Sequence, residues 1–210
     1  MDLFPLMVRL ESKTCIVVGA GEIAASKAAT LIGCGAQVTV IAPHATESIQ
    51  AQAREGKLTW HGREFVPTDL DGAFLVIAAT NSPAVNEEVF RAGRERGVLC
   101  NVVDDPEHCD FFYPAVVRRG ALQIAISTGG HSPALAHRLR VELEQQFGPE
   151  YEAWVEEVGR RRREIMARDL SDARRRDLLE QIASRESYEE FVRRRASAAS
   201  AKNGAAPREW

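Results

Sequence analysis

The chain has 210 residues, of which 45% are hydrophobic and 27% charged, and its net charge is −3. This suits one nucleotide-binding domain with a smaller appendage, folded around a buried core. No apolar run approaches the roughly 20 residues that span a bilayer, and the N-terminus lacks the basic start and apolar stretch of a signal peptide, so we expect a cytoplasmic protein without membrane association.

The first half of the chain alternates short apolar strands with helices. Strands are predicted over residues 14–18, 37–41, 57–60, 74–79 and 98–103. Helices are predicted over residues 22–32, 46–54 and 83–96, the last beginning with a proline. Alternation with short connections predicts a Rossmann-like α/β domain, in which helices cover both faces of a parallel sheet.

The pattern changes after residue 110. Two strands, 111–118 and 121–127, follow one another without a helix between them, which predicts a β-hairpin. Helices are then predicted over 134–146, 151–167, 173–182 and 188–195. We therefore expect a dinucleotide-binding domain over 1–113, a hairpin region over 114–148, a helical C-terminal domain over 149–196 and a disordered tail, rich in Ala and Ser, over 197–210.

A glycine-rich motif joins the first strand to the first helix. Gly19-Ala20-Gly21-Glu22-Ile23-Ala24 has the form G-x-G-x-x-A, and its place between a buried strand and a helix gives it physical meaning. Gly19 permits a tight turn, Gly21 lets the backbone approach a diphosphate, and Ala24 lets the helix pack near the strand. The helix N-terminus then favours an anion. The motif predicts dinucleotide binding; the alternative is a glycine turn that only connects two elements.

The next question is whether the dinucleotide is NAD or NADP. The acid that usually holds the adenosine ribose lies near the end of the second strand. Here that end reads Ile41-Ala42-Pro43-His44, with neither an acid nor an arginine. The residues leave NAD and NADP open, and the lack of a basic partner for a 2′-phosphate favours NAD.

Asp104 is the candidate catalytic residue. It follows the fifth predicted strand, and open α/β sheets present reactive groups at the carboxyl ends of their strands. A carboxylate there can accept a proton while a hydride leaves for the cofactor. Asp104-Asp105-Pro106 is also a common turn sequence, in which an aspartate bonds to its own backbone. Both interpretations stand on the residues alone.

A second glycine loop, residues 127–133, joins the hairpin to the following helix. Ser132 suits an N-cap and Pro133 the first helical position, so ordinary capping explains both. The preceding Thr128-Gly129-Gly130 favours a binding role, since a helix N-terminus attracts carboxylates.

Other chemistry is not indicated. The four cysteines form no C-x-x-C pair and the five histidines have no ligand spacing, so no protein-bound metal is expected. The arginine runs at 160–163, 174–176 and 193–195 have acidic residues in neighbouring turns and no interleaved aromatics. Such runs are typical of solvated helix faces, and we expect no nucleic-acid binding.

Four motifs in order resemble the precorrin-2 dehydrogenase/sirohydrochlorin ferrochelatase family, which includes the N-terminal module of sirohaem synthase. They are VVGAGEIA (17–24), IAATN (77–81), NVVD (101–104) and ISTGGHSP (126–133). The resemblance implies NAD-dependent oxidation of precorrin-2 to sirohydrochlorin. Many members also insert ferrous iron, and no residue here decides whether this chain does so with ferrous or cobalt ion. The family forms homodimers through the region after the nucleotide domain.

The resemblance also implies roles for individual residues. It makes Asp104 the general base. Cofactor contacts are implied at Gly19, Gly21, Glu22, Ile23, Pro43, His44 and Thr80. Substrate contacts are expected at Thr128, Gly129, Gly130, Arg138 and Arg140, and we hypothesise that Arg118 and Arg119 also pair with carboxylates of the polyanionic tetrapyrrole.

Three departures accompany the resemblance. Ala20 replaces the usual third consecutive glycine, and Ser26-Lys27 replaces an Arg-Lys pair. No methyltransferase module follows in this sequence, which implies the stand-alone form. A different class also fits the residues: a regulatory module that senses NAD without catalysis, in which Asp104 and the second glycine loop are structural.

Overall fold

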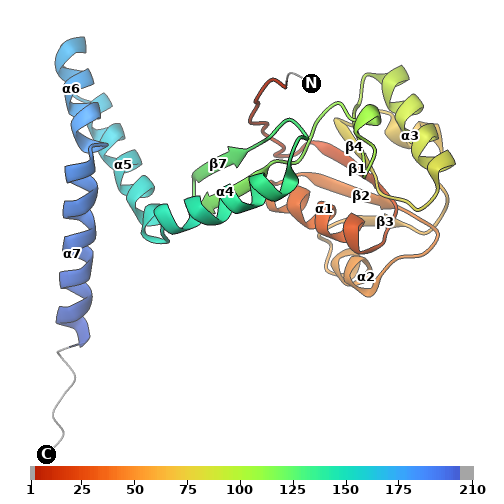
Figure 1. Ribbon diagram of the computed structural model, residues 1–210, viewed down its shortest axis with the longest axis horizontal. Helices are drawn as coiled ribbons and strands as arrows, with labels where there is room; N and C mark the ends of the chain where they lie inside the picture. Colours follow the sequence, from red (N-terminus) through yellow and green to blue (C-terminus); the bar gives the residue numbers. More distant parts are fainter. Residues whose placement is uncertain (1–2, 204–210) are drawn as a thin grey trace, which may run out of the picture. The chain divides into compact units, whose positions relative to one another are not determined.

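A computed structural model describes residues 3–203, and the chain divides into two compact units (Figure 1). One unit is Phe4–Tyr113, and the other contains the chain from Pro114 onward. The prediction of separate regions over 114–148 and 149–196 within the second unit stays a prediction. Between residues 3 and 203, no helix is long and apolar enough to cross a membrane.

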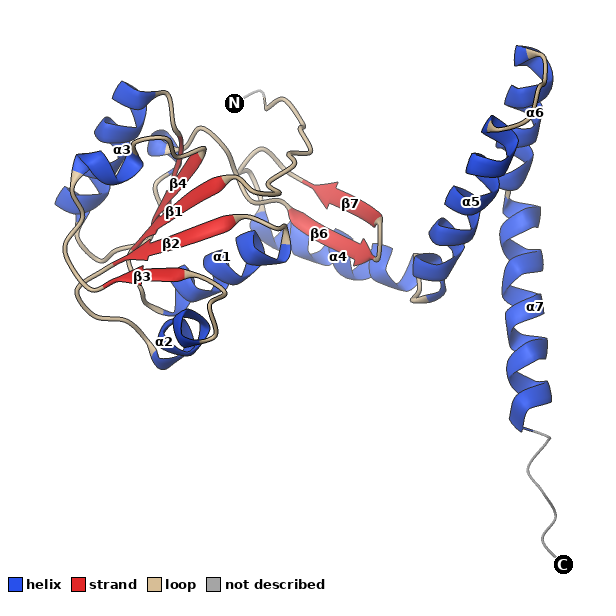
Figure 2. Cartoon of the chain, turned by 180° about the vertical axis from the view of Figure 1, so that it is seen from behind, coloured by secondary structure: helices blue, strands red, loops and turns tan. Residues whose placement is uncertain are grey.

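The first unit is built on a five-stranded parallel sheet (Figures 1 and 2). Its strands are β1 (Thr14–Val18), β2 (Gln37–Ile41), β3 (Thr59–His61), β4 (Leu75–Ala78) and β5 (Leu99–Val102), in the order β3-β2-β1-β4-β5. Apart from Thr14, the central strands β1 and β4 are apolar because they are covered on both faces. All five predicted strands and their Rossmann-like arrangement are confirmed; only β3 begins two residues later than expected.

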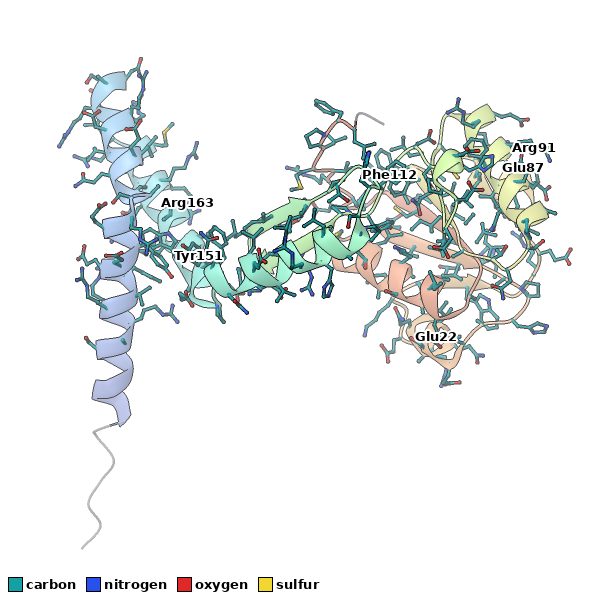
Figure 3. The ribbon with its side chains drawn as sticks, viewed as in Figure 1. Glu22, Glu87, Arg91, Phe112, Tyr151 and Arg163 are labelled. Carbon is teal, nitrogen blue, oxygen red and sulfur yellow. The ribbon has the colours of Figure 1, made fainter. Side chains whose placement is uncertain are left out.

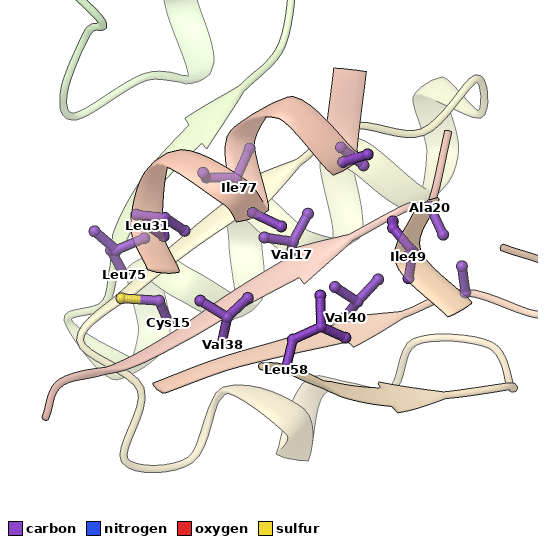
Figure 4. Packing of buried hydrophobic residues seen from close by; sticks show 14 residues of the cluster. Cys15, Val17, Ala20, Leu31, Val38, Val40, Ile49, Leu58, Leu75 and Ile77 are labelled. Atoms are coloured by element: carbon purple, nitrogen blue, oxygen red, sulfur yellow. The ribbon is translucent and has the colours of Figure 1, made fainter. Parts of the chain in front are cut away.

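Helices α1 (Glu22–Gly33) and α2 (Glu47–Arg54) cover one face of the sheet. Figure 4 shows the side chains between them, among which Cys15, Val17, Val38 and Val40 come from β1 and β2. Ala24, Ala25 and Ala28 of α1 are almost completely buried, so this helix lies close to the strands. The close approach fixes where the N-terminus of α1 lies relative to the end of β1.

The other face is covered by α3 (Pro83–Arg96) and by a short 3-10 helix, η1 (Pro67–Leu70). Val89 of α3 and Leu70 of η1 are fully buried against strand residues such as Val76. Ser82 caps α3 by accepting a hydrogen bond from the backbone N–H of Val85, and Gly97 ends the helix in a left-handed conformation. The 3-10 helix was not predicted from the sequence, because four residues carry no periodic signal.

The second unit begins with an antiparallel hairpin, β6 (Ala115–Arg119) and β7 (Leu122–Ile126). It continues as α4 (Pro133–Gln146), α5 (Glu150–Met166), α6 (Asp172–Ile182) and α7 (Arg185–Asn203). Tyr151 and Trp154 of α5 pack against Tyr188 and Phe191 of α7, with ring centroids 4.7–5.9 Å apart. The predicted hairpin and the four helices are confirmed, although β6 begins four residues later than predicted and α7 begins three residues earlier.

The C-terminal end of α7 differs from the prediction. We expected a helix to about Arg195 and disorder from residue 197, whereas α7 continues to Asn203. Alanine has the highest helix propensity, and residues 196–203 contain four of them, so composition alone was a poor reason to predict disorder there. The remainder of the expected tail, residues 204–210, lies outside the described residues.

Candidate functional site

Gly19 occupies a position in the β1–α1 turn that no other residue could take. Its φ is +105°, a conformation that L side chains rarely adopt. A Cβ atom at Gly19 would lie 2.2 Å from the backbone oxygen of Ala79, which follows β4. The glycine therefore lets the turn after β1 touch the turn after β4, and its own N–H donates to the carbonyl oxygen of Ile41 over 2.9 Å.

The fold itself does not require a glycine at Gly21, in contrast to Gly19. Gly21 is the N-cap of α1 with a φ of −79°, which any residue can adopt, and a Cβ atom added there would meet nothing within 4 Å. The space in front of the first turn of α1 is therefore open. Unpaired N–H groups and the helix dipole favour an anion at this point, so the residues fit the diphosphate of a dinucleotide.

A cleft of about 580 Å³ opens at this edge of the sheet. It is lined by Val18, Gly19, Ala20, Gly21, Ile41, Ala42, Pro43, Glu64, Phe65, Ala79, Thr80, Asn81, Ser82, Val85 and Glu88. Of the cofactor contacts expected from the sequence, Gly19, Gly21, Pro43 and Thr80 are brought together here. Glu22, Ile23 and His44 are exposed neighbours that do not line the cleft.

Thr80 organises the turn after β4. Its hydroxyl lies 2.7 Å from Oδ1 of Asn86 and accepts a hydrogen bond from the backbone N–H of Ser82 over 3.1 Å. Nδ2 of Asn86 donates to the Thr80 carbonyl oxygen over 3.2 Å. These bonds connect the turn to α3 and fix the position of residues 79–82, which line the cleft.

Sequence reasoning missed several lining residues, among them Glu64, Phe65 and Glu88. Glu64 and Phe65 belong to the irregular segment between β3 and η1, where no periodic pattern or motif marks a residue as functional. Glu88 lies on α3, where a carboxylate is indistinguishable in sequence from the other acidic residues of that helix. Sequence spacing identifies residues at the ends of regular strands. It does not identify cleft residues, such as Glu64 and Phe65, that lie in an irregular segment.

Asp104 lies just beyond β5 in a left-handed conformation, with a φ of +61°. Such backbone angles cost free energy for a non-glycine residue and are concentrated at functional sites. The side chain is exposed, and no hydrogen bond of its carboxylate is found within residues 3–203. Val103 and Asp104 do form a turn, which the backbone N–H of Asp105 closes by donating to the carbonyl oxygen of Val102 over 3.2 Å, but the Asp104 carboxylate takes no part in it.

The chain around Asp104 is held from both sides. The side chain of Asn101, which is buried, donates to the carbonyl oxygen of Phe111 over 2.9 Å. The carboxylate of Asp110 accepts from the backbone N–H of Cys100 over 2.9 Å and pairs with Arg94 at 3.3 Å. Asp104 therefore projects from a loop whose two ends are fixed against β5.

Lys27 of α1 is a positively charged group whose pKa is influenced by the charge of Asp104. Its ammonium lies 3.7 Å from the ring centroid of Tyr113, a cation–π contact. Burial lowers the pKa of Lys27, and the negative charge of Asp104 opposes this shift. The carboxylate therefore has a positive charge in its surroundings, although the two groups form no ion pair in the described part of the chain.

His108 ties the loop after Asp104 to α3. Its Nδ1 lies 2.6 Å from Oδ2 of Asp105 and its Nε2 lies 3.3 Å from Oε2 of Glu87, which neighbours Arg91 on α3 (Figure 3). The hydrogen bond to Asp105 raises the pKa of His108, and the negative charges of Asp105, Glu87 and Glu107 add to the effect.

This arrangement predicts a pH-dependent contribution to stability. Because the pKa of His108 is raised by folding, its stabilisation is complete below the ordinary value of 6.5 and is lost as the pH rises through the raised value. We expect His108→Gln to lower the free energy of unfolding more at about pH 5.5 than at about pH 8.5. Urea unfolding at both pH values measures this; an equal loss at both would contradict the ion-pair role.

The second glycine loop lies in the second unit. Gly129 and Gly130 both have positive φ, and Thr128 accepts a hydrogen bond from the backbone N–H of Ser132 over 3.0 Å. Ser132 in turn accepts from the N–H of Leu135, so its predicted role as N-cap of α4 is confirmed, with Pro133 in the first turn. The Thr128 hydroxyl thus stabilises the conformation of this loop through a hydrogen bond inside it.

The arginines proposed for substrate binding differ in availability. Arg119 donates through Nε to the carbonyl oxygen of Phe147 and through Nη2 to that of Glu144, so it caps the C-terminal end of α4. This structural role replaces the hypothesis that Arg119 binds substrate. Arg138 and Arg140 pair with Glu142 and Glu144 one turn further along α4, and Arg118 is exposed.

Residues 6–115, more than half of the chain, match the model of a family described as "Putative NAD(P)-binding". The chain belongs to this family. A second model, described as "Sirohaem biosynthesis protein central", matches residues 119–146. The resemblance carried by the four sequence motifs is thereby confirmed.

Similar proteins extend the comparison. A siroheme synthase of Photorhabdus laumondii is 38% identical over 181 residues, covering 86% of this chain and 38% of the relative. Siroheme synthase 1 of Aeromonas hydrophila is 44% identical over 144 residues, covering 69% and 31%. The chain thus spans less than two fifths of the length of these relatives. A solved structure named "SirC, precorrin-2 dehydrogenase" is 28% identical with a TM-score of 0.77, covering 91% of this chain and 98% of that one.

Proposed function

We propose that the protein is an NAD-dependent dehydrogenase that oxidises precorrin-2 to sirohydrochlorin in sirohaem biosynthesis. The observation that carries this proposal is Asp104, an exposed carboxylate held in a left-handed conformation at the end of β5, in the same unit as the glycine-lined cleft. The likeness to a precorrin-2 dehydrogenase over 91% of the chain supports it. As part of the proposal, the protein acts in the cytoplasm.

The reaction removes a hydride and a proton from the tetrapyrrole, giving sirohydrochlorin, NADH and H⁺. A bound NAD⁺ would accept the hydride. Gly21 would admit its diphosphate to the N-terminus of α1, Gly19 permits the turn that leads into this helix, and Pro43 and Thr80 also line the cleft. Asp104 takes the proton from the substrate and releases it to solvent, which its exposure permits.

Substrate carboxylates would bind to Thr128, Gly129 and Gly130 at the N-terminus of α4 and to Arg138 and Arg140. Each arginine already has a glutamate partner one turn away, which a stronger anion can displace. We expect Arg138→Ala and Arg140→Ala to weaken precorrin-2 binding and to reduce its dependence on salt. Unchanged KM and salt dependence would remove both residues from the substrate site.

We also propose that the protein is a homodimer through residues 114–148. The hairpin β6–β7 is a two-stranded sheet, and within the described residues neither outer edge pairs with another strand. Two-stranded sheets are marginal alone, and unpaired edges are ready to bind a second copy. Light scattering after size-exclusion chromatography should give twice the mass of the chain; a monomer at working concentration would contradict the proposal.

One assay separates the enzyme from a regulatory NAD-sensing module. The protein is mixed with NAD⁺ and precorrin-2, and the absorbance of NADH and of sirohydrochlorin is followed. We expect both to rise together. Tight binding of NADH without turnover would favour the sensor. Adding ferrous or cobalt ion, as substrate, then shows whether metal insertion accompanies oxidation, with Asp104 as the acceptor of pyrrole protons.

A further inference from the structure

The cleft contains an acidic residue at the end where no acid was expected. Glu64 lines the cleft together with Ala42 and Pro43, which follow β2. The chain reaches this place because β3 pairs with β2 up to His61 and Nε1 of Trp60 donates to the carbonyl oxygen of Ala42 over 3.0 Å. The exits of β2 and β3 are thereby fixed side by side, and the segment after β3 passes the cleft.

This end of the cleft is where an adenosine ribose belongs. In dinucleotide-binding sheets the diphosphate lies at the turn after the first strand, and the ribose of the adenosine lies toward the end of the second. An acid that accepts a hydrogen bond from the ribose 2′-hydroxyl usually comes from that second strand. Here the second strand ends without one, and Glu64 comes from the neighbouring strand's exit instead.

The charge of Glu64 is not neutralised by the arginine beside it. Nη1 of Arg63 lies 2.8 Å from Oδ2 of Asp69 and Nη2 lies 2.5 Å from Oδ1, and the same carboxylate also accepts from the N–H of Val66. The pair raises the pKa of Arg63 and lowers that of Asp69. Among residues 3–203 the carboxylate of Glu64 forms no ion pair. Arg63 is thus occupied by Asp69.

We propose that Glu64 selects a dinucleotide with a free ribose 2′-hydroxyl over one with a 2′-phosphate. Its carboxylate accepts a hydrogen bond from the hydroxyl and repels the phosphate, which carries negative charge of its own. The inference rests on the proposed function, because it requires that the cleft hold a dinucleotide. It adds the residue that distinguishes NAD from NADP, which the end of β2 does not supply.

The test compares the binding of NADH and NADPH to the unaltered protein and to Glu64→Gln, by fluorescence titration without substrate. We expect Glu64→Gln to improve NADPH affinity relative to NADH by about tenfold or more, because a like charge at close range is removed. The improvement should shrink at high salt. Glu88→Gln removes a carboxylate from the same cleft and should change the ratio less. Glu64 is exposed, so thermal unfolding of Glu64→Gln should match the unaltered protein.

The outcomes separate the two proposals. If the unaltered protein binds neither NADH nor NADPH, the proposed function fails, and this inference fails with it. If NADH binds and Glu64→Gln leaves the preference unchanged, only the role of Glu64 is wrong. An equal effect of Glu88→Gln would also overturn it, since selectivity would then follow the net charge of the cleft.

Discussion

Replacing Asp104 by Asn is expected to lower the turnover of precorrin-2 by about 10²- to 10⁴-fold, the usual contribution of a positioned general base. The amide has nearly the shape of the carboxylate but cannot accept the proton that leaves the substrate. The affinity for NADH should stay unchanged, because Asp104 does not line the cleft. Glu107→Gln is the matched control, since it removes a carboxylate from the same loop. If Asp104→Asn turned over at the rate of the unaltered protein, the proposed mechanism would be wrong.

The stability of Asp104 variants supplies a second measurement. Asn tolerates the left-handed conformation as Asp does, so Asp104→Asn should unfold at the same temperature as the unaltered protein. Asp104→Ala should lose about 1 kcal/mol of unfolding free energy, because Ala adopts a positive φ less readily than Asp or Asn. Loss of activity in both variants, with loss of stability in only one, would identify a residue placed for chemistry.

The regular part of the fold could be predicted from sequence because its signals are local. Runs such as residues 15–18 are apolar throughout, and a parallel strand buried on both faces requires this. The Ser132-Pro133 helix start is a capping signal that needs no tertiary information. In contrast, η1 is too short for a periodic pattern, and the Ala-rich end of α7 has a composition shared by helices and disordered tails.

The site could be predicted only in part, for a related reason. The glycines and Asp104 follow strands, so their positions at one edge of the sheet follow from topology. Glu64 comes from an irregular segment, and only the pairing of β3 with β2 brings it to the cleft. Arg119 shows the opposite failure: its charge and position suggested a ligand for carboxylates, but the carbonyl groups at the end of α4 use its donors.

The two glycines of the first loop should respond differently to the same substitution. Gly21→Ala places a methyl group in the open space before α1, where the diphosphate would lie. We expect NADH affinity to fall by about 10- to 100-fold, equivalent to one or two hydrogen bonds to a charged group. The free energy of unfolding should change by less than about 1 kcal/mol, because the φ of −79° is allowed for Ala.

Gly19→Ala should instead damage the fold. Its methyl group would lie 2.2 Å from the carbonyl oxygen of Ala79 at a φ of +105°, so both the backbone and the contact between two turns would have to shift. We expect a loss of about 3 kcal/mol or more of unfolding free energy. Urea unfolding and NADH titration of both variants distinguish a glycine that admits the ligand from one that permits the turn. Equal loss of stability in the two variants would mean that Gly21 is structural, and the open space before α1 would no longer support a diphosphate site.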